Sequence, residues 1–144
     1  MKRILGIDWG ERKLGLSIGD TELYIAVPYK VIRYNNRDTA IKEIKEICLK
    51  ENIDEVIVGV PITEEGKLGY MAKRVLDFVE HLKRENIEVK TYDERLTTSQ
   101  IYSEKRYHQL KHKTKKKRRV KDEDSLSATI ILQAYLDSIK STLK

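Results

Sequence analysis

Acidic residues at three distant points of the sequence are the strongest candidates for chemistry. Asp8 ends an apolar run near the N-terminus, and Asp93 and Glu94 end a later one. Asp124 stands four residues before Ala128, on the apolar stripe of the last predicted helix. Carboxylates that converge without His or Cys are the ligands that hard cations such as Mg²⁺ or Mn²⁺ require. Because such ions activate water and stabilise the leaving oxygen in phosphodiester cleavage, the pattern predicts a metal-dependent nuclease site.

Each of these acids also has a simpler interpretation. Asp8 is compatible with a residue that initiates a turn before Gly10. The pair Asp93 and Glu94 is compatible with a solvated strand end, and Asp124 with an acid in the first turn of a helix. However, three separate elements each place an acid at a strand end or a helix start. This repetition favours a shared metal site over three unrelated explanations.

The hydrophobic pattern predicts the elements that must position the acids. Continuous or alternating apolar runs indicate strands, and apolar residues three and four apart indicate helices. Pro28 places the third strand at or near a sheet edge. The similar junctions at 50–54 and 84–88 predict helices that end at Asn52 and Asn86. The expected strands cover 3–8, 14–19, 22–34, 56–60 and 87–92. The first expected helix follows the capping candidates Asn36 and Asp38, and the other expected helices cover 68–85, about 97–110 and about 124–142.

This order of elements predicts the fold class. Three antiparallel strands come first, and two helix-to-strand units follow them. Since such units form right-handed crossovers between parallel strands, we expect an α/β fold. It consists of one five-stranded mixed sheet, with three antiparallel and then two parallel strands, flanked by helices.

The composition restricts the class of protein. The 144 residues suffice for one hydrophobic core, so we expect one domain over residues 1–144, acting as a monomer or a weak homodimer. The longest apolar stretch, 56–62, is much shorter than the roughly 18 residues of a membrane span, so neither a membrane partner nor a secretory signal is expected. Cys48 is the single cysteine, which predicts a reducing, cytoplasmic location.

A basic segment indicates a polyanionic partner. The chain carries 29 Lys and Arg against 23 Asp and Glu, for a net charge of +6. Eight of the eleven residues from Lys111 to Lys121 are basic and none is acidic, which predicts a mobile loop that contacts phosphates without reading sequence. A merely solubilising loop is the alternative. The candidate binding residues in this segment are Lys115, Lys116, Lys117, Arg118 and Arg119.

Four blocks of sequence together resemble the YqgF family, also called RuvX, of ribonuclease H-like nucleases. The blocks span nearly the whole chain in the family's order. Its usual Lys-Arg pair is here Arg12-Lys13, and its Asn and Asp in the loop after Pro61 are here Thr63 and Glu65. The blocks are G-I-D-W-G-E-R-K-L-G-L at 6–16, V-G-V-P at 58–61, D-E-R-L-T-T at 93–98 and D-S-L-S-A-T-I-I-L-Q-A-Y-L at 124–136.

The resemblance implies a ribonuclease H-like fold and a nuclease that uses Mg²⁺ or Mn²⁺ in 5′-end maturation of precursor 16S ribosomal RNA. It also implies that Asp8, Glu94 and Asp124 are the catalytic metal ligands, with Asp93 as the alternative to Glu94. Arg95 would face phosphate or brace the acids, and the basic pair at 12–13 would contact nucleic acid.

The sequence is also compatible with other functions. A Holliday junction resolvase acting on four-way DNA is the nearest alternative, and a non-catalytic RNA-binding protein is a further one. Asp8, Gly10 and Gly15 also resemble the first phosphate loop of actin-like ATPases and sugar kinases. Those proteins need a second domain, for which 144 residues leave no room.

Overall fold

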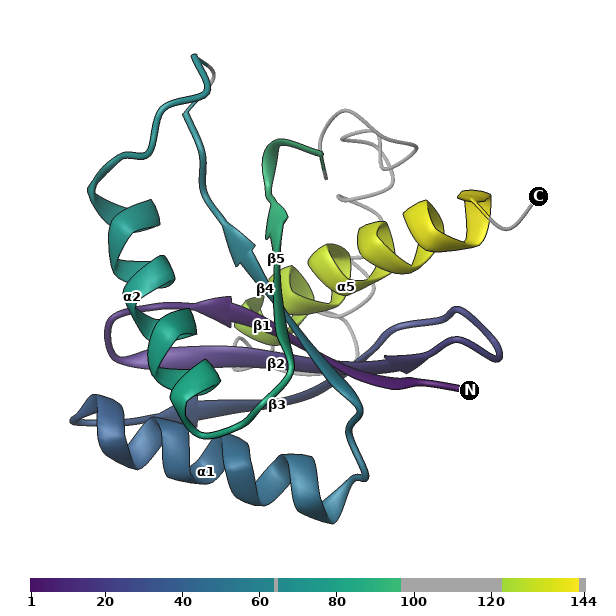
Figure 1. The fold of residues 1–144 in the computed structure, drawn as a ribbon, viewed down its shortest axis with the longest axis horizontal. Coiled ribbons are helices and arrows are strands. Elements are labelled where there is room, and N and C mark those ends of the chain that lie inside the picture. Colours follow the sequence, from purple (N-terminus) through teal and green to yellow (C-terminus); the bar gives the residue numbers. More distant parts are fainter. Residues whose placement is uncertain (64, 97–122, 143–144) are drawn as a thin grey trace.

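A five-stranded mixed sheet forms the centre of the computed structural model, which describes residues 1–63, 65–96 and 123–142 (Figure 1). The strand order is β3-β2-β1-β4-β5, in which the first three are antiparallel neighbours and β4 and β5 run parallel to β1. The predicted mixed sheet is therefore confirmed. The strands are β1 (Arg3–Trp9), β2 (Lys13–Asp20), β3 (Val27–Arg33), β4 (Glu55–Val60) and β5 (Val89–Asp93).

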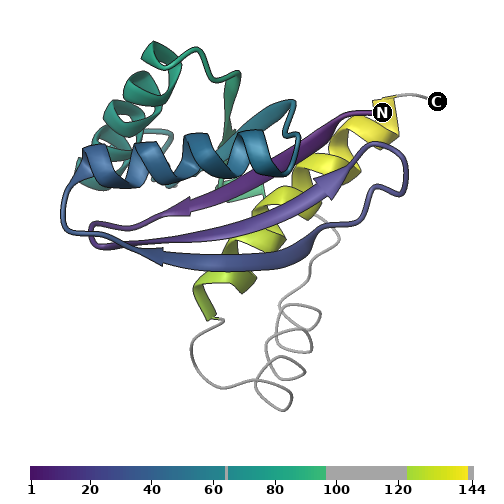
Figure 2. The same cartoon turned by 90° about the horizontal axis from the view of Figure 1, so that it is seen from below.

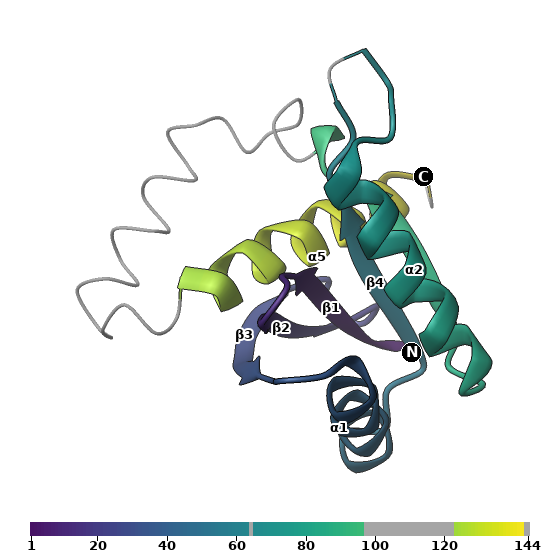
Figure 3. The ribbon, with the colours of Figure 1, turned by 90° about the vertical axis from the view of Figure 1, so that its left-hand side faces the viewer.

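Helices cover both faces of the sheet. The helices α1 (Arg37–Lys50) and α2 (Tyr70–Arg84) lie on one face, and α5 (Glu123–Thr142) crosses the other (Figures 2 and 3). Alternation along β1 explains this division, because successive side chains point to opposite faces. Leu5 and Ile7 belong to the core beneath α1 and α2, whereas Ile4 belongs to the core beneath α5.

The helix ends follow the local sequence. Asn36 caps α1, and its side-chain oxygen accepts the backbone N–H of Thr39 at 2.9 Å. Asn52 and Asn86 adopt positive φ angles of 53° and 63° just after α1 and α2. This left-handed conformation ends a helix and is tolerated by Asn better than by most residues, as the two similar junctions predict.

α5 docks directly on the backbone of the sheet. A Cβ added to Gly6 would lie 2.5 Å from Ser17 Oγ and 2.8 Å from Leu132 Cβ, so β1 has room only for glycine there. The buried Ser17 hydroxyl donates to the Ala128 carbonyl oxygen at 2.8 Å. This hydrogen bond and the close approach fix the first half of α5 against β1 and β2.

Some element bounds differ from the predictions. β3 begins at Val27 rather than at residue 22, because residues 21–23 form a turn that breaks the apolar run. β3 is nevertheless an edge strand, as Pro28 predicts. The expected helix over 97–110 and the basic loop at 111–121 lie outside the described residues. Within the described ranges, none of the helices combines the length and the apolar character that crossing a membrane demands.

Candidate active site

Asp8 lies at the carboxyl end of the central strand β1. It is the last residue but one of the strand, and its side chain is half-buried. Because side chains alternate along a strand, Asp8 shares a face with Ile4 and Gly6, and α5 covers that face. Open sheets with parallel strands bind ligands outside the carboxyl ends of the strands. Asp8 therefore stands at the edge where a substrate is expected.

Glu94 directly follows β5 and turns back over β4. Its backbone N–H donates to the carbonyl oxygen of Val60 at 3.0 Å. Its side chain lies above Gly59, because a Cβ at that glycine would lie 3.1 Å from Glu94 Cγ and 3.3 Å from Glu94 Cδ. Ile131 of α5 occupies the same region, with its Cδ1 2.6 Å from that Cβ position. The missing side chain at Gly59 is what leaves room for the Glu94 carboxylate.

The structure brings Asp8 and Glu94 to the same edge and the same face of the sheet. The parallel register pairs Ile7 of β1 with Val58 of β4, so Asp8 and Gly59 are the next positions along the two strands. Neighbouring strands are about 4.8 Å apart. Since Glu94 lies over Gly59, its carboxylate and that of Asp8 project from adjacent positions.

Asp93 and Glu94 have opposite environments. Burial raises the pKa of Glu94, and the negative charge of Asp93 raises it further. Asp93 instead accepts hydrogen bonds from Arg95, whose Nη2 lies 2.6 Å from Asp93 Oδ2, and these bonds lower the pKa of Asp93. The Asp93 carboxylate is therefore engaged by a guanidinium, which favours Glu94 over Asp93 as a metal ligand.

Arg95 connects the end of β5 to the loop that follows β4. Besides its bonds to Asp93, its Nη1 lies 3.5 Å from the carbonyl oxygen of Thr63. Of the two roles that the resemblance implies for Arg95, this geometry favours the bracing role.

Asp124 is the second residue of α5. The structure describes its backbone but not its side chain. The direction of the helix nevertheless locates this backbone. The Ala128 carbonyl lies near Gly6 of β1, whereas Leu136, two turns later, lies near Gly19 of β2, which pairs with Ile4 near the start of β1. One turn back from Ala128, the backbone of Asp124 therefore lies toward the carboxyl end of β1.

The predicted basic residues fall into two groups. Arg12 lies in the turn between β1 and β2, and Lys13 begins β2, so both are near the carboxyl end of β1. Lys115, Lys116, Lys117, Arg118 and Arg119 lie outside the described residues.

The described acids fit a divalent cation in their chemistry. Asp8 and Glu94 offer hard oxygen ligands, and a buried carboxylate is stabilised by a nearby positive charge. Among the side chains that the structure describes, no group of three His, Cys, Asp or Glu is arranged to hold a metal. The predicted third ligand, Asp124, is not among those side chains.

Sequence reasoning missed the part played by Gly59. The pattern V-I-V-G-V at 56–60 predicts a strand, and V-G-V-P at 58–61 is one of the blocks that resemble the family, but neither gives Gly59 a role of its own. An isolated glycine inside a strand is a known sign of a close approach by another group. That signal pointed to the position over which Glu94 lies.

Solved structures define the class of fold. The structure matches Thermus thermophilus RuvC in complex with a Holliday junction substrate with a TM-score of 0.69 and 14% identity, over 99% of this chain and 97% of that one. It matches the yeast mitochondrial Holliday junction resolvase Ydc2 with a TM-score of 0.63 and 14% identity, over 94% and 78% of the two chains. The fold is thus the ribonuclease H-like fold of the RuvC-like resolvases.

Sequence comparison then gives the family. The family model RuvX, described as "Holliday junction resolvase", matches residues 2–138. A Clostridium acetobutylicum protein curated as "Putative pre-16S rRNA nuclease" is 38% identical over 138 residues, which are 95% of this chain and 99% of that protein. A Clostridium tetani protein of the same name is 36% identical over 95% of this chain and 97% of its own length. The chain therefore belongs to the RuvX family of nucleases, as its four blocks of sequence predict.

Proposed function

We propose that this chain is an endonuclease that requires Mg²⁺ or Mn²⁺ and cuts precursor 16S ribosomal RNA in the maturation of its 5′ end. The observation that carries the proposal is that Asp8 of β1 neighbours Gly59 of β4, over which Glu94 lies, at the carboxyl edge of the sheet. The names of the curated relatives support the choice of RNA.

We assign the roles of the site residues from their positions and from the resemblance to the family. Asp8, Glu94 and Asp124 are the ligands of the divalent ion, which when bound supplies a Lewis acid for water activation and for the leaving oxygen. Arg95 holds Asp93 through hydrogen bonds and keeps that second acid away from the ligand set. The protein thus contributes fixed oxygen ligands on a rigid strand edge.

Basic residues hold the substrate. Arg12 and Lys13 lie beside the carboxyl end of β1, where they contact the phosphates that flank the cut. The segment 115–119 adds further phosphate contacts, which attract a polyanion without reading its sequence. Binding is therefore expected to weaken steeply with salt.

A resolvase acting on four-way DNA is the second candidate. The description of the RuvX family and the fold shared with RuvC favour it. Both candidates use the same acids, so only the substrate distinguishes them.

We also propose that residues 1–144 act as one nuclease domain in the cytoplasm, as a monomer or a weak homodimer. The free Cys48 is consistent with a reducing location. Light scattering across a range of concentrations tests the oligomeric state.

The test compares cleavage of both substrates by the purified chain. A precursor 16S fragment that spans the mature 5′ end and a four-way DNA junction are each incubated with Mg²⁺, Mn²⁺ or EDTA. Asp8→Asn, Glu94→Gln and Asp124→Asn are each expected to lower the cleavage rate at least about 100-fold.

Glu88→Gln is the matched control. Glu88 precedes β5 whereas Glu94 follows it, so the same chemical change is made at the opposite end of one strand, at an exposed side chain. The control is expected to cut at the wild-type rate. Cleavage that persists in EDTA or in Asp8→Asn contradicts the proposal, and RNA binding without any cleavage supports the non-catalytic alternative.

A further inference from the structure

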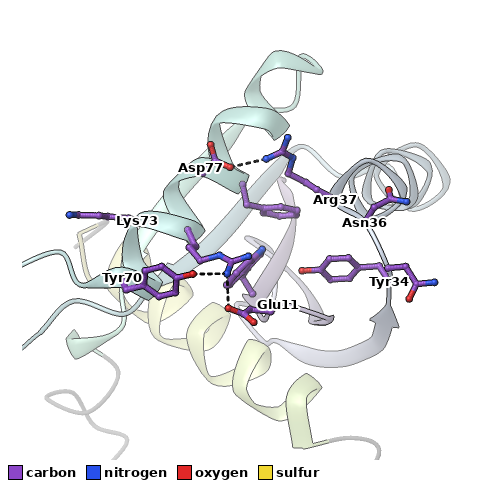
Figure 4. Close-up of a pocket in the computed structure, with 11 residues that line it drawn as sticks. Glu11, Tyr34, Asn36, Arg37, Tyr70, Lys73 and Asp77 are labelled. Carbon is purple, nitrogen blue, oxygen red and sulfur yellow. Dashed lines mark hydrogen bonds and ion pairs between the residues drawn. The ribbon is translucent and has the colours of Figure 1, made fainter.

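A pocket of about 490 Å³ opens on the face of the sheet opposite α5, next to the end of β1 (Figure 4). Its volume is within the range of sites that bind small molecules or parts of larger ones. Three segments form its walls: the turn after β1, the linker between β3 and α1, and the first turns of α2. The residues that matter most are Trp9, Glu11, Tyr34, Asn35, Tyr70 and Arg74.

One wall consists of two aromatic rings, those of Trp9 and Tyr70, that both lie close to the Arg74 guanidinium. The Arg74 guanidinium carbon lies 5.5 Å from the centre of the Trp9 ring and 5.6 Å from that of Tyr70. Arg74 Nη1 also donates to Glu11 Oε1 at 2.7 Å and to the Tyr70 hydroxyl at 3.0 Å (Figure 4). Tyr70 is 70% exposed, yet these contacts fix the direction of its ring.

The opposite wall is also aromatic. Tyr34 lies across the pocket in Figure 4, and its hydroxyl donates to the carbonyl oxygen of Gly10. Asn35 follows it, and within the described part of the chain no hydrogen bond engages its side-chain amide. The pocket thus offers ring faces together with an available amide that both donates and accepts hydrogen bonds.

The charges in the pocket exclude a phosphate as its main ligand. Arg74 is paired with Glu11, and Arg37 is paired with Asp77 at 2.9 Å. Both guanidiniums are therefore already neutralised, and the two carboxylates repel an anion. Lys73 has no ion pair among the described residues, but it points away from the other labelled side chains in Figure 4. Aromatic walls with balanced charge suit a neutral, planar ligand.

The pocket is adjacent to the proposed active site. Trp9 directly follows Asp8 in β1, and alternation places the two side chains on opposite faces of the strand. A strand of nucleic acid that crosses this edge reaches the acids on one face and the pocket on the other.

We propose that the pocket binds one unpaired nucleobase of the substrate, next to the phosphate that is cut. This inference rests on the proposed nuclease function. Bases of single-stranded segments are recognised by stacking on aromatic side chains and by hydrogen bonds along their edges. Tyr70 and Tyr34 provide the rings, and Asn35 provides the edge contact. Cleavage is thereby directed to sites that have an unpaired base beside them.

Trp9 provides a direct readout, since it is the only tryptophan in the chain. An RNA of ten uridines is titrated into the full chain in EDTA, with Trp9 emission and the anisotropy of a label on the RNA recorded together. An abasic ten-unit sugar-phosphate of equal charge is the matched ligand. The uridine RNA is expected to change Trp9 emission at the concentrations at which it binds, and the abasic chain is expected to leave the emission unchanged.

Variants of Tyr70 test the stacking. Tyr70→Leu is expected to weaken binding of the uridine RNA by about 5- to 150-fold, as loss of one stacked base does. Tyr70→Phe retains the ring and is expected to recover most of the affinity. Because Tyr70 is exposed, both variants are expected to fold, and circular dichroism checks this.

The outcomes separate this inference from the nuclease proposal. Unchanged Trp9 emission on RNA binding, an equal response to the abasic chain, or wild-type binding by Tyr70→Leu overturns the base-binding pocket while leaving cleavage untouched. A base-dependent response of Trp9 in a chain that cuts neither substrate supports the pocket and refutes the nuclease. A pocket that serves a protein partner instead predicts no response to either ligand.

Discussion

Replacing Gly59 with alanine tests the close contact between β4 and Glu94. The added Cβ would lie 2.6 Å from Ile131 Cδ1, 3.1 Å from Glu94 Cγ and 3.3 Å from Glu94 Cδ. Carbon atoms in a packed interior are separated by about 3.5 Å or more. Ile131 therefore has to retreat by about 0.9 Å, and Glu94 by about 0.4 Å, for the variant to fold.

These displacements set the expected magnitudes. Overpacking of a core by one methyl group costs about 1–3 kcal/mol, which lowers the melting temperature of a chain of this size by about 4–12 °C. A catalytic group misplaced by about 1 Å costs about 100-fold in rate. For the smaller displacement of Glu94, we expect the cleavage rate of Gly59→Ala to fall about 10-fold.

A second substitution separates the two effects. Ile131→Val removes Cδ1, the atom nearest to the new methyl group, and alone costs about 0.5–1.5 kcal/mol. The double variant Gly59→Ala with Ile131→Val is expected to recover the melting temperature but not the cleavage rate, because Glu94 remains displaced. Melting curves and single-turnover cleavage measure the two quantities. Full activity in Gly59→Ala, or recovery of both quantities in the double variant, refutes the argument that Gly59 positions Glu94.

Three further predictions concern stability and reactivity. Gly6→Ala is expected to lower the free energy of unfolding in urea by more than about 2 kcal/mol, because the new Cβ would lie 2.5 Å from the Ser17 hydroxyl and α5 would have to move. An unchanged urea midpoint contradicts the close packing of α5 on β1. Burial opposes ionisation of Glu55, but hydrogen bonds from Tyr135 and Lys90 outweigh it and lower its pKa from the ordinary 4.5. Ionised Glu55 therefore stabilises the folded chain above pH 4.5, and this contribution is lost as the pH falls below that value. Glu55→Gln is expected to flatten the acid limb of a plot of unfolding free energy against pH. Burial raises the pKa of Cys48 to about 11, so iodoacetamide at pH 8 is expected to alkylate it much more slowly in the native chain than in urea; equal rates contradict this assignment.

The fold was predictable where the sequence states one pattern clearly. The runs I-L-G-I-D and V-I-V-G-V are apolar on both faces, which only central strands allow, and β1 and β4 occupy those places. The start of β3 was not predictable, because Leu23 and Ile25 read as strand residues but are 68% and 56% exposed in the connection before it. An apolar side chain in a loop gives the same local signal as one in a strand.

The candidate site was predictable in its residue types but not in its geometry. The alternation of side chains along a strand cannot decide whether Asp93 or Glu94 is the metal ligand. Glu94 lies beyond the last residue of β5, and the direction of its side chain depends on the space over Gly59. The pocket at Trp9 was not predictable either, since Tyr70 and Arg74 belong to a helix whose packing angle no local pattern specifies.

The glycine contacts beneath α5 have a consequence for how this chain can acquire new substrate preferences. A Cβ added at Gly6, Gly19 or Gly59 would lie within 3.0 Å of atoms of α5 or of its neighbours, so each substitution forces those atoms to shift. A helix held in this way cannot be repositioned by substituting the residues beneath it, as a helix resting on larger side chains can. New substrate preferences in such a chain therefore have to arise in the loops at the carboxyl edge, while the sheet and α5, which carry the acids, keep their arrangement.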